Sequence, residues 1–519
     1  MIAWLWAAYF AVKLCLYFKG VIAVHFWPNL ALLLLAMPYA PSRGQGVKKS
    51  MILRQCLAVP LGAALFWYDS YLPPFLYTMR FLYHNQGVML SGFSNQFLAA
   101  AAANKATLAE FALIAAVCFV AAKKKLHPTP AVFLALMLVF VESLRGGGHG
   151  VSAALDRFYA RQAGKKVAFL APPPGAPPFD IVFIHICSFS WDDLSVIEDT
   201  APALLQNANL VFTRFNSATS YSTPAALRLS RAPCGQVAHD ALYRSWPPQC
   251  SLWVQLRRVG YRTYAAMNTE PGYFHMAGDL HKWADMDMPI PVDGLPTQLL
   301  SFDDAKVLAN LPVLERWLKI RGRDDAPRAA LFYNTITLHT GGHPDTPEWW
   351  KESLLQRYPE HFAWLQSDVL AFENDLARSG RNTVLVIIPE HGAALRGSAI
   401  QAPTLRDIPL PRITEVPVAV RFIGPLFKAA PPKIAVDKPE SYLAVAKLLS
   451  DLISDPLLVS RPGALASEVQ SLPTTGYLAE TAAWKVFKDG DRYYLLGKDG
   501  QWRTLPREDS PTRVAEATP

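Results

Sequence analysis

The uneven distribution of apolar residues is the feature that most restricts how this chain folds. Half of its 519 residues are apolar, and the excess is concentrated before residue 145. A helix needs about 20 apolar residues to cross a bilayer, and several stretches here are near the lower limit. The stretches lie at residues 2–18, 21–39, 51–68, 106–122 and 129–144. We therefore expect an N-terminal bundle of about five transmembrane helices in residues 1–144.

Basic residues between the stretches predict the orientation of the bundle. One basic cluster, from Arg43 to Arg54, separates the second and third stretches, and Lys123 to Lys125 separate the fourth and fifth. Placing both clusters in the cytoplasm gives five crossings and exports the C-terminal part. Lys13, within the first stretch, fits this arrangement less well. The net charge of +8 is dispersed and no nucleic-acid motif is present, so we assign it to membrane topology and expect no nucleic-acid partner.

A linker is predicted between the bundle and the exported part. The glycines after Arg145 end the last apolar stretch, and the proline-rich segment 171–178 indicates a stiff, extended connector. We place the linker at residues 145–179 and the exported domain at residues 180–519.

Strand and helix patterns alternate along the exported domain. Nearly unbroken apolar runs indicate central strands of a sheet that is covered on both faces, at 180–187, 330–339, 383–391 and 416–423. Helical patterns lie at 224–231, 303–319, 348–379 and 440–454. This alternation predicts a three-layer α/β/α domain with a mostly parallel sheet.

Chemically capable residues fall at the ends of three predicted strands: Cys187, His339 and the pair Glu390-His391. In open α/β sheets, ligands bind beyond the carboxyl ends of the strands. Each residue also has an ordinary explanation, as an inert buried thiol, a strand-end histidine or a polar turn. Their coincidence at three strand ends favours a site.

A stretch of small hydroxyl residues, from Asn216 to Ser222, adds a candidate nucleophile. Pro224 suits the first turn of a helix, so Ser222 would lie where unpaired backbone N–H groups point outward. Such a place favours an anion, or a serine that must become an alkoxide. An ordinary helix cap is the alternative explanation.

Thiolate, carboxylate and imidazole form a plausible zinc set, with one position left for a reacting oxygen. If Ser222 fills that position beside Cys187, Glu390 and His391, the metal would deliver an alkoxide at neutral pH. Attack of the alkoxide on phosphorus would give a covalent phosphoserine. A second alcohol would then attack this phosphoserine and accept the phosphoryl group.

Other polar residues near these positions could hold phosphate oxygens or move protons. They are Tyr221, His339, His343 and Arg406. For Arg406, a salt bridge with Asp407 or with another acidic residue is the alternative.

Two cysteines of the exported part, Cys234 and Cys250, are 16 residues apart. Oxidation is permitted outside the cytoplasm, so we expect a disulfide that closes this loop. Cys187 is then left as the unpaired thiol, which suits a metal ligand. A disulfide that includes Cys187 is the competing account.

In combination, several motifs resemble the BcsG family of bacterial cellulose biosynthesis. They are Ile-His-Ile-Cys-Ser-Phe-Ser-Trp191, Asn-Ser-Ala-Thr-Ser-Tyr-Ser222, Ala-Pro-Cys-Gly-Gln236, Tyr-Asn-Thr-Ile-Thr-Leu-His339, Pro-Glu-His-Gly392 and Leu-Arg-Asp-Ile-Pro409. The resemblance extends over most of the chain. It implies an alkaline-phosphatase-like domain in the periplasm, anchored in the inner membrane. It also implies transfer of phosphoethanolamine from phosphatidylethanolamine to the glucose 6-hydroxyl of cellulose, with the cellulose synthase complex as a partner.

The same resemblance implies roles for individual residues. Ser222 would be the nucleophile and Cys187, Glu390 and His391 the zinc ligands. Tyr221, His339 and Arg406 would belong to the substrate site, and Cys234–Cys250 would be the disulfide. Related lipid A phosphoethanolamine transferases and lipoteichoic acid synthases commonly have an acidic residue in place of Cys187 and a threonine in place of Ser222. Two alternatives stay open: an acceptor such as lipid A or another periplasmic glycan, and a membrane scaffold without catalytic activity.

Overall fold

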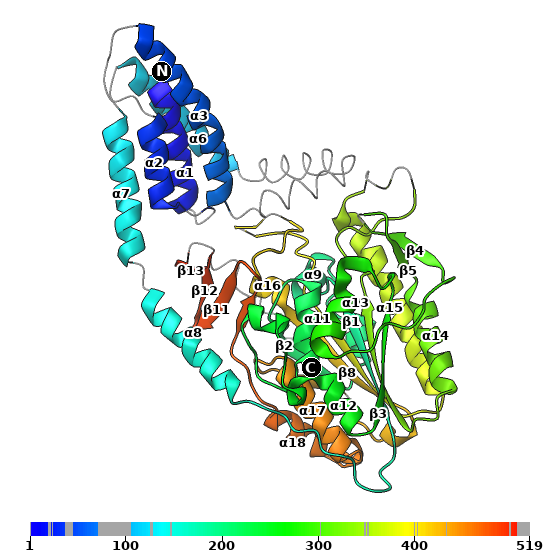
Figure 1. Ribbon diagram of the computed structural model, residues 1–519. Helices are drawn as coiled ribbons and strands as arrows, with labels where there is room; N and C mark the ends of the chain where they lie inside the picture. The colour runs from blue at the N-terminus through cyan, green and yellow to red at the C-terminus, as the bar shows by residue number, and fades with distance from the viewer. Residues whose placement is uncertain are drawn as a thin grey trace. The chain divides into compact units, whose positions relative to one another are not determined.

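The structure is a computed structural model of the chain (Figure 1). It describes residues 2–18, 22, 24–36, 45–70, 105–124, 128–145, 148–301, 303–346, 349, 352–398, 400–401, 403–431, 433–497 and 500–505. The chain as described separates into two compact units. The first contains Met1–Gly148, Ser398–Pro403 and Leu496–Pro506, and the second contains His149–Gly397 and Thr404–Leu495.

Helices of the first unit lie at all five predicted apolar stretches. They are α1 (Ile2–Phe18), α2 (Phe26–Ala36), α3 (Gln45–Asp69), α6 (Lys105–Lys123) and α7 (Thr129–Arg145). Among the described residues, the segment Met51–Asp69 is the one helix long and apolar enough to cross a membrane. The segments Ile2–Tyr17, Phe26–Ala36 and Thr129–Leu138 are apolar but shorter. The five-crossing bundle is therefore still a prediction.

A buried polar cluster joins the first three helices. The Lys13 ammonium of α1 pairs with the Asp69 carboxylate at the end of α3 and donates to Asn29 Oδ1 of α2 at 2.7 Å. Asn29 donates to Asp69 Oδ2 at 2.7 Å, and His25 Nδ1 lies 2.6 Å from Asp69 Oδ1. Lys13 and Asp69 are both buried. The lysine that fits the predicted topology poorly is thus compensated by a carboxylate from another helix.

Replacing Lys13 by leucine should destabilise the first unit strongly. The change leaves the Asp69 carboxylate buried without its cation, which costs about 3–5 kcal/mol when one partner of a buried pair is removed. Removing both charges in Lys13→Leu/Asp69→Leu should cost less than Lys13→Leu alone. The measurement is the Tm of the full chain in detergent, with Lys123→Leu at the exposed end of α6 as control. Equal Tm values for wild type and Lys13→Leu would contradict the pairing.

The second unit is built on a seven-stranded sheet of described residues, ordered β3-β6-β1-β7-β8-β2-β9. Its strands are β1 (Asp180–Ile186), β2 (Leu210–Asn216), β3 (Tyr261–Met267), β6 (Arg328–Thr335), β7 (Thr383–Pro389), β8 (Glu415–Ile423) and β9 (Ile434–Val436). β1 pairs in parallel with β6 and β7, and β3 pairs in parallel with β6. β8 runs antiparallel to both of its neighbours, β7 and β2. The sheet is therefore mixed, although mostly parallel as predicted.

Helices cover both faces of this sheet, which confirms the three-layer prediction (Figure 1). Successive strand residues point to opposite faces. Phe183 of β1 therefore packs into one core with α11, α12, α13 and α17, while Ile184 packs into the other with α14 and α15. The described helices of the second unit are α8 (Gly148–Ala163), α9 (Trp191–Val196), α10 (Ala203–Gln206), α11 (Ser222–Ser230), α12 (Leu252–Arg258), α13 (Met276–Ala284), α14 (Asn310–Gly322), α15 (Leu354–Arg378), α16 (Pro411–Thr414), α17 (Tyr442–Ser454) and α18 (Ala464–Ser471), of which α8 contributes no residue to either core.

Shorter strands lie outside the main sheet. β4 (Thr297–Leu300) pairs antiparallel with β5 (Lys306–Leu308), and β10 (Leu478–Glu480) pairs antiparallel with β11 (Lys485–Asp489). The remaining two are β12 (Arg492–Leu496) and β13 (Trp502–Thr504). The helix predicted at 303–319 is wrong in its first part, because residues 306–308 pair with β4 and the helix begins at Asn310.

The register of the parallel strands brings their ends to one edge. Ile186 of β1 is level with Thr335 of β6 and with Pro389 of β7. The residues that follow these three strands therefore meet at the same edge. The strand predicted at 330–339 ends at Thr335, so His339 lies in the turn beyond it.

Candidate active site

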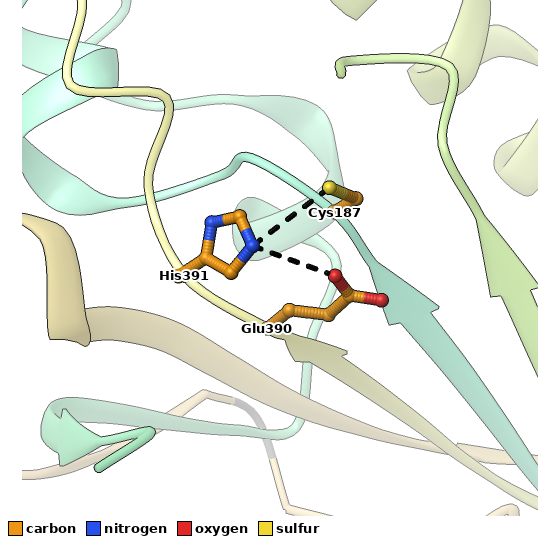
Figure 2. A group of neighbouring side chains, drawn as sticks. All are labelled: Cys187, Glu390 and His391. Atoms are coloured by element: carbon orange, nitrogen blue, oxygen red, sulfur yellow. Dashed lines mark hydrogen bonds and ion pairs between the residues drawn. The ribbon is translucent and has the colours of Figure 1, made fainter. Parts of the chain in front are cut away.

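Three predicted ligands lie together at the carboxyl edge of the sheet. Cys187 follows β1, and Glu390 and His391 follow β7. His391 Nε2 is 3.9 Å from Cys187 Sγ and 3.6 Å from Glu390 Oε2. Figure 2 marks both contacts with dashed lines. Their potential ligand atoms all lie within 4.8 Å of one another, and all three residues are buried. We refer to these three residues as the Cys187 group.

Backbone hydrogen bonds hold the two strand-end loops in register. Glu390 N–H donates to Ile186 O at 2.8 Å, and Phe189 N–H donates to His391 O at 2.7 Å. Gly392 allows the close approach, because a Cβ there would lie 2.4 Å from the Ser190 hydroxyl oxygen. The positions of the Cys187 group therefore follow from the sheet register and from a glycine.

Hydrogen bonds orient the Glu390 carboxylate. His185 Nδ1 lies 3.1 Å from Oε1, and Asn334 donates to the same oxygen. Burial alone would raise the pKa of Glu390, but the His185 ring, His391 and the Ser222 hydroxyl together outweigh it and the pKa falls to about 2. Among the described residues, Oε2 is buried without a hydrogen-bond partner. A charged carboxylate thus presents a free oxygen to the other two side chains.

The other two side chains offer nitrogen and sulfur. His391 Nδ1 lies 2.9 Å from Gly392 O, so it carries the proton and leaves the Nε2 lone pair facing the group. Burial lowers the pKa of His391 to about 3, and the Arg406 guanidinium adds to the effect, so the ring is neutral. Burial raises the pKa of the Cys187 thiol to about 12, with a further contribution from Glu390. A cation would favour the thiolate, and the three donor types match a zinc site.

Ser222 also reaches this group. It is the first residue of α11, and its hydroxyl oxygen lies 3.5 Å from Cys187 Sγ. The N-cap is Tyr221, whose side chain makes no capping hydrogen bond. Ser222 is therefore not the helix cap that the alternative explanation required. The first backbone N–H groups of a helix lack intrahelical partners, which suits an anion beside this hydroxyl.

Arg406 and His339 lie beside one another. Arg406 Nη1 donates to the Ser188 hydroxyl at 2.8 Å, and its Nη2 is 3.5 Å from His339 Nε2. Gly341 N–H donates to His339 Nδ1 at 3.2 Å, so Nε2 carries the proton. Burial and the Arg406 charge lower the pKa of His339 to about 3. Two neighbouring donors, one charged and one neutral, can therefore serve a common anionic oxygen.

Family comparisons match nearly the whole chain. The C-terminal domain of cellulose biosynthesis protein BcsG matches residues 147–502, and its N-terminal domain matches residues 6–141. The chain belongs to the BcsG family. The cellulose biosynthesis proteins BcsG of Escherichia coli (strain K12) and Salmonella typhimurium (strain LT2) are each 30% identical to it, over 97% of this chain and 96% of theirs.

Solved structures are similar at lower identity. The C-terminal periplasmic domain of EcEptC from Escherichia coli, in complex with Zn, is 14% identical, with a TM-score of 0.41 over 56% of this chain and 86% of that one. The lipoteichoic acid synthase LtaP from Listeria monocytogenes is 14% identical, with a TM-score of 0.43 over 66% of this chain and 91% of that one.

Two predicted site residues of this BcsG-family chain make other contacts. The Tyr221 hydroxyl donates to Asp407 Oδ1 at 2.7 Å. The His343 ring stacks on Trp349, with ring centroids 3.9 Å apart. Among the described residues, no hydrogen bond or ion pair joins His343 to the Cys187 group. The roles of His343 and Tyr221 in the site are therefore still predictions.

Sequence reasoning missed several residues that position the site. Asn334 and Ser188 contact Glu390 and Arg406, and neither was selected. An asparagine inside an apolar strand was the available signal for Asn334. Ser188 has a left-handed backbone with a φ of 64°, which nothing in its sequence context indicates.

The predicted disulfide is present. Cys234 and Cys250 are bonded, with a sequence separation of 16. Among the six cysteines, all of which lie in the described residues, Cys187 is free. The competing account, a disulfide that includes Cys187, is therefore wrong.

Removing this disulfide should lower stability without removing the site. The double change Cys234→Ser/Cys250→Ser should cost about 3 kcal/mol, because a loop of this length loses closure entropy in the unfolded chain. The measurement is the Tm of the full chain, in comparison with Cys118→Ser in α6, which leaves the disulfide intact. A double variant as stable as wild type would contradict this expectation.

Proposed function

We propose that this chain transfers phosphoethanolamine from phosphatidylethanolamine to the glucose 6-hydroxyl of cellulose, through a phosphoserine on Ser222. The observation that carries the proposal is the approach of the Ser222 hydroxyl to within 3.5 Å of Cys187 Sγ, beside Glu390 and His391. Membership of the BcsG family supports cellulose as the acceptor. The domain would be alkaline-phosphatase-like and lie in the periplasm.

Zinc is the metal that the donor set fits. Cys187, Glu390 and His391 offer sulfur, oxygen and nitrogen, and Glu390 Oε2 is a buried acceptor without a hydrogen-bond partner in the described part of the chain. Ser222 would occupy the remaining position of a four-coordinate site. A zinc ion held there would lower the pKa of the serine hydroxyl and offset negative charge on the phosphate.

The residues of the chain would then act as follows. Ser222 Oγ, having lost its proton to solvent, forms a bond to phosphorus, and the bond from phosphorus to the diacylglycerol oxygen breaks. The departing oxygen takes a proton from water. Arg406 and His339 donate to the non-bridging oxygens and stabilise the charge that develops on them. In the second step the glucose hydroxyl oxygen bonds to phosphorus and loses its proton to solvent. The bond from phosphorus to Ser222 Oγ breaks, which returns Ser222 to the alkoxide with which the first step began.

The first unit would keep the domain next to its donor. Helices α1, α2, α3, α6 and α7 would form the five crossings of the inner membrane, whose outer leaflet presents phosphatidylethanolamine. Export of the second unit to the periplasm would give access to newly made cellulose, in association with the cellulose synthase complex.

Transfer of a labelled headgroup tests the proposal. Membranes that contain the chain and ethanolamine-labelled phosphatidylethanolamine are supplied with either cellulose or lipid A. We expect label on cellulose with wild type and none with Ser222→Ala. Label on lipid A and not on cellulose would show that lipid A is the acceptor, against the proposal. Absence of label on both would support the alternative of a membrane scaffold without catalytic activity.

A further inference from the structure

A small cavity lies in the second unit. It has about 20 Å³ of space open to water, enough for one or two water-sized occupants. Residues from five parts of the chain line it: α8, the loop before α11, α11, the segment that follows α11, and the region from α17 onward. They include Gln162, Arg228, Arg231, Gln236, Tyr442 and Thr475. Cys187, Ser222, Glu390 and His391 do not contribute to its lining.

The lining contains several buried polar atoms without a hydrogen-bond partner among the described residues. Four belong to groups that can donate: Arg228 Nε, Arg231 Nε, Tyr442 OH and Thr475 Oγ1. One acceptor atom, Gln236 Oε1, is also buried without a hydrogen-bond partner among the described residues. An unsatisfied buried polar group costs about 1–3 kcal/mol, so such a concentration indicates an occupant. The excess of donors indicates that this occupant is an acceptor.

Positive charge at the cavity is not balanced by the residues around it. Arg228 Nη2 lies 3.3 Å from Glu480 Oε2, but Glu480 also pairs with Lys485. Arg231 donates to Gly235 O at 2.8 Å and has no carboxylate in ion-pair contact in the described part of the chain. Burial and the Arg228 charge lower the pKa of Arg231 to about 10. Two cations and one shared carboxylate leave net positive charge beside buried donors.

We propose that this cavity binds a small inorganic anion of the size of chloride, held by Arg228 and Arg231 with the hydroxyl groups of Tyr442 and Thr475. Water would satisfy the donors but would leave the charge unbalanced. The available space suits a monatomic ion better than an oxyanion. A bound anion would tie α11 to α17. Because α11 begins at Ser222, the anion would also stabilise the helix that carries the proposed nucleophile.

Thermal unfolding of the full chain in detergent tests this site. Sodium chloride is titrated against sodium gluconate at constant ionic strength. We expect chloride to raise the Tm by at least about 2 °C in a saturable way, because an anion that binds the folded state stabilises it. Arg231→Gln should lose the saturable rise. Arg257→Gln removes an arginine that pairs with Asp285 outside the cavity, and it should keep the rise.

Three outcomes would overturn the proposal: equal Tm values in chloride and gluconate, a full rise in Arg231→Gln, or loss of the rise in Arg257→Gln. If Arg231→Gln does not fold, crystals of the wild-type chain grown in sodium bromide decide the question. An anomalous bromide peak between Arg228 and Arg231 supports the site, and its absence there overturns it.

Discussion

Replacing Ser222 by alanine should abolish transfer while leaving the fold and the other three proposed metal ligands, Cys187, Glu390 and His391, in place. The variant lacks the oxygen that bonds to phosphorus, so the rate of transfer should fall by at least about 10³-fold. The assay is headgroup transfer to cellulose, with zinc content and Tm measured on the same preparation. Because Tyr221 is the N-cap of α11, alanine at position 222 removes no capping hydrogen bond.

The helix-cap explanation predicts the opposite pattern for the same variant. Loss of a serine cap costs about 1 kcal/mol and would leave the chemistry in place. If Ser222→Ala keeps the wild-type Tm but loses transfer, the result supports Ser222 as the nucleophile. If its Tm falls and transfer is retained, the result contradicts that assignment. Thr223→Ala, one residue further along the same turn, is the matched control and should remain active.

Replacing Cys187 by alanine should remove the metal and the activity together. Wild-type chain should retain about one zinc ion after dialysis, because three buried donors converge on one point. Without the sulfur, zinc affinity should fall by at least about 100-fold, since even partners outside the metal's own ligands contribute about 10–100-fold. Metal content is measured by elemental analysis, and transfer is measured as above.

Cys118→Ala provides the control for this experiment. Cys118 is also free but lies in α6, so its removal should leave both zinc content and transfer unchanged. A chelator should inactivate the wild-type chain, and added zinc should restore it. Full activity in a wild-type chain without zinc, or full zinc content in Cys187→Ala, would contradict the ligand assignment.

The central strands and the edge where the site lies were predictable from the sequence. Runs such as 180–187 and 383–391 are apolar on both faces, and this pattern is typical of strands covered by helices. β2 and β3 were missed. The exposed Arg214 interrupts β2, and β3 begins with the mixed sequence Tyr-Arg-Thr-Tyr, in which Arg262 is exposed. The antiparallel direction of β8 was also missed, because side-chain periodicity is the same for either direction.

Within the site, residues directly after strands were easier to predict than residues on loops. Cys187, Glu390 and His391 are placed by the register of β1 and β7. Arg406 follows a long loop, and its position depends on a hydrogen bond from Ser220 to its backbone carbonyl, which has no counterpart in sequence spacing. His343 was selected for its spacing from His339, and that spacing did not indicate that its ring stacks on Trp349. The spacing in the sequence indicated only that His339 and His343 are close along the chain. The direction of the His343 ring depends on its packing against Trp349.

The most direct test of the account is a search for the covalent intermediate. The full chain is incubated with phosphatidylethanolamine in the absence of cellulose, digested, and examined by tandem mass spectrometry. We expect a phosphoethanolamine adduct on Ser222, which disappears when cellulose is added. An adduct on another residue, or active enzyme that never carries one, would contradict a phosphoserine mechanism.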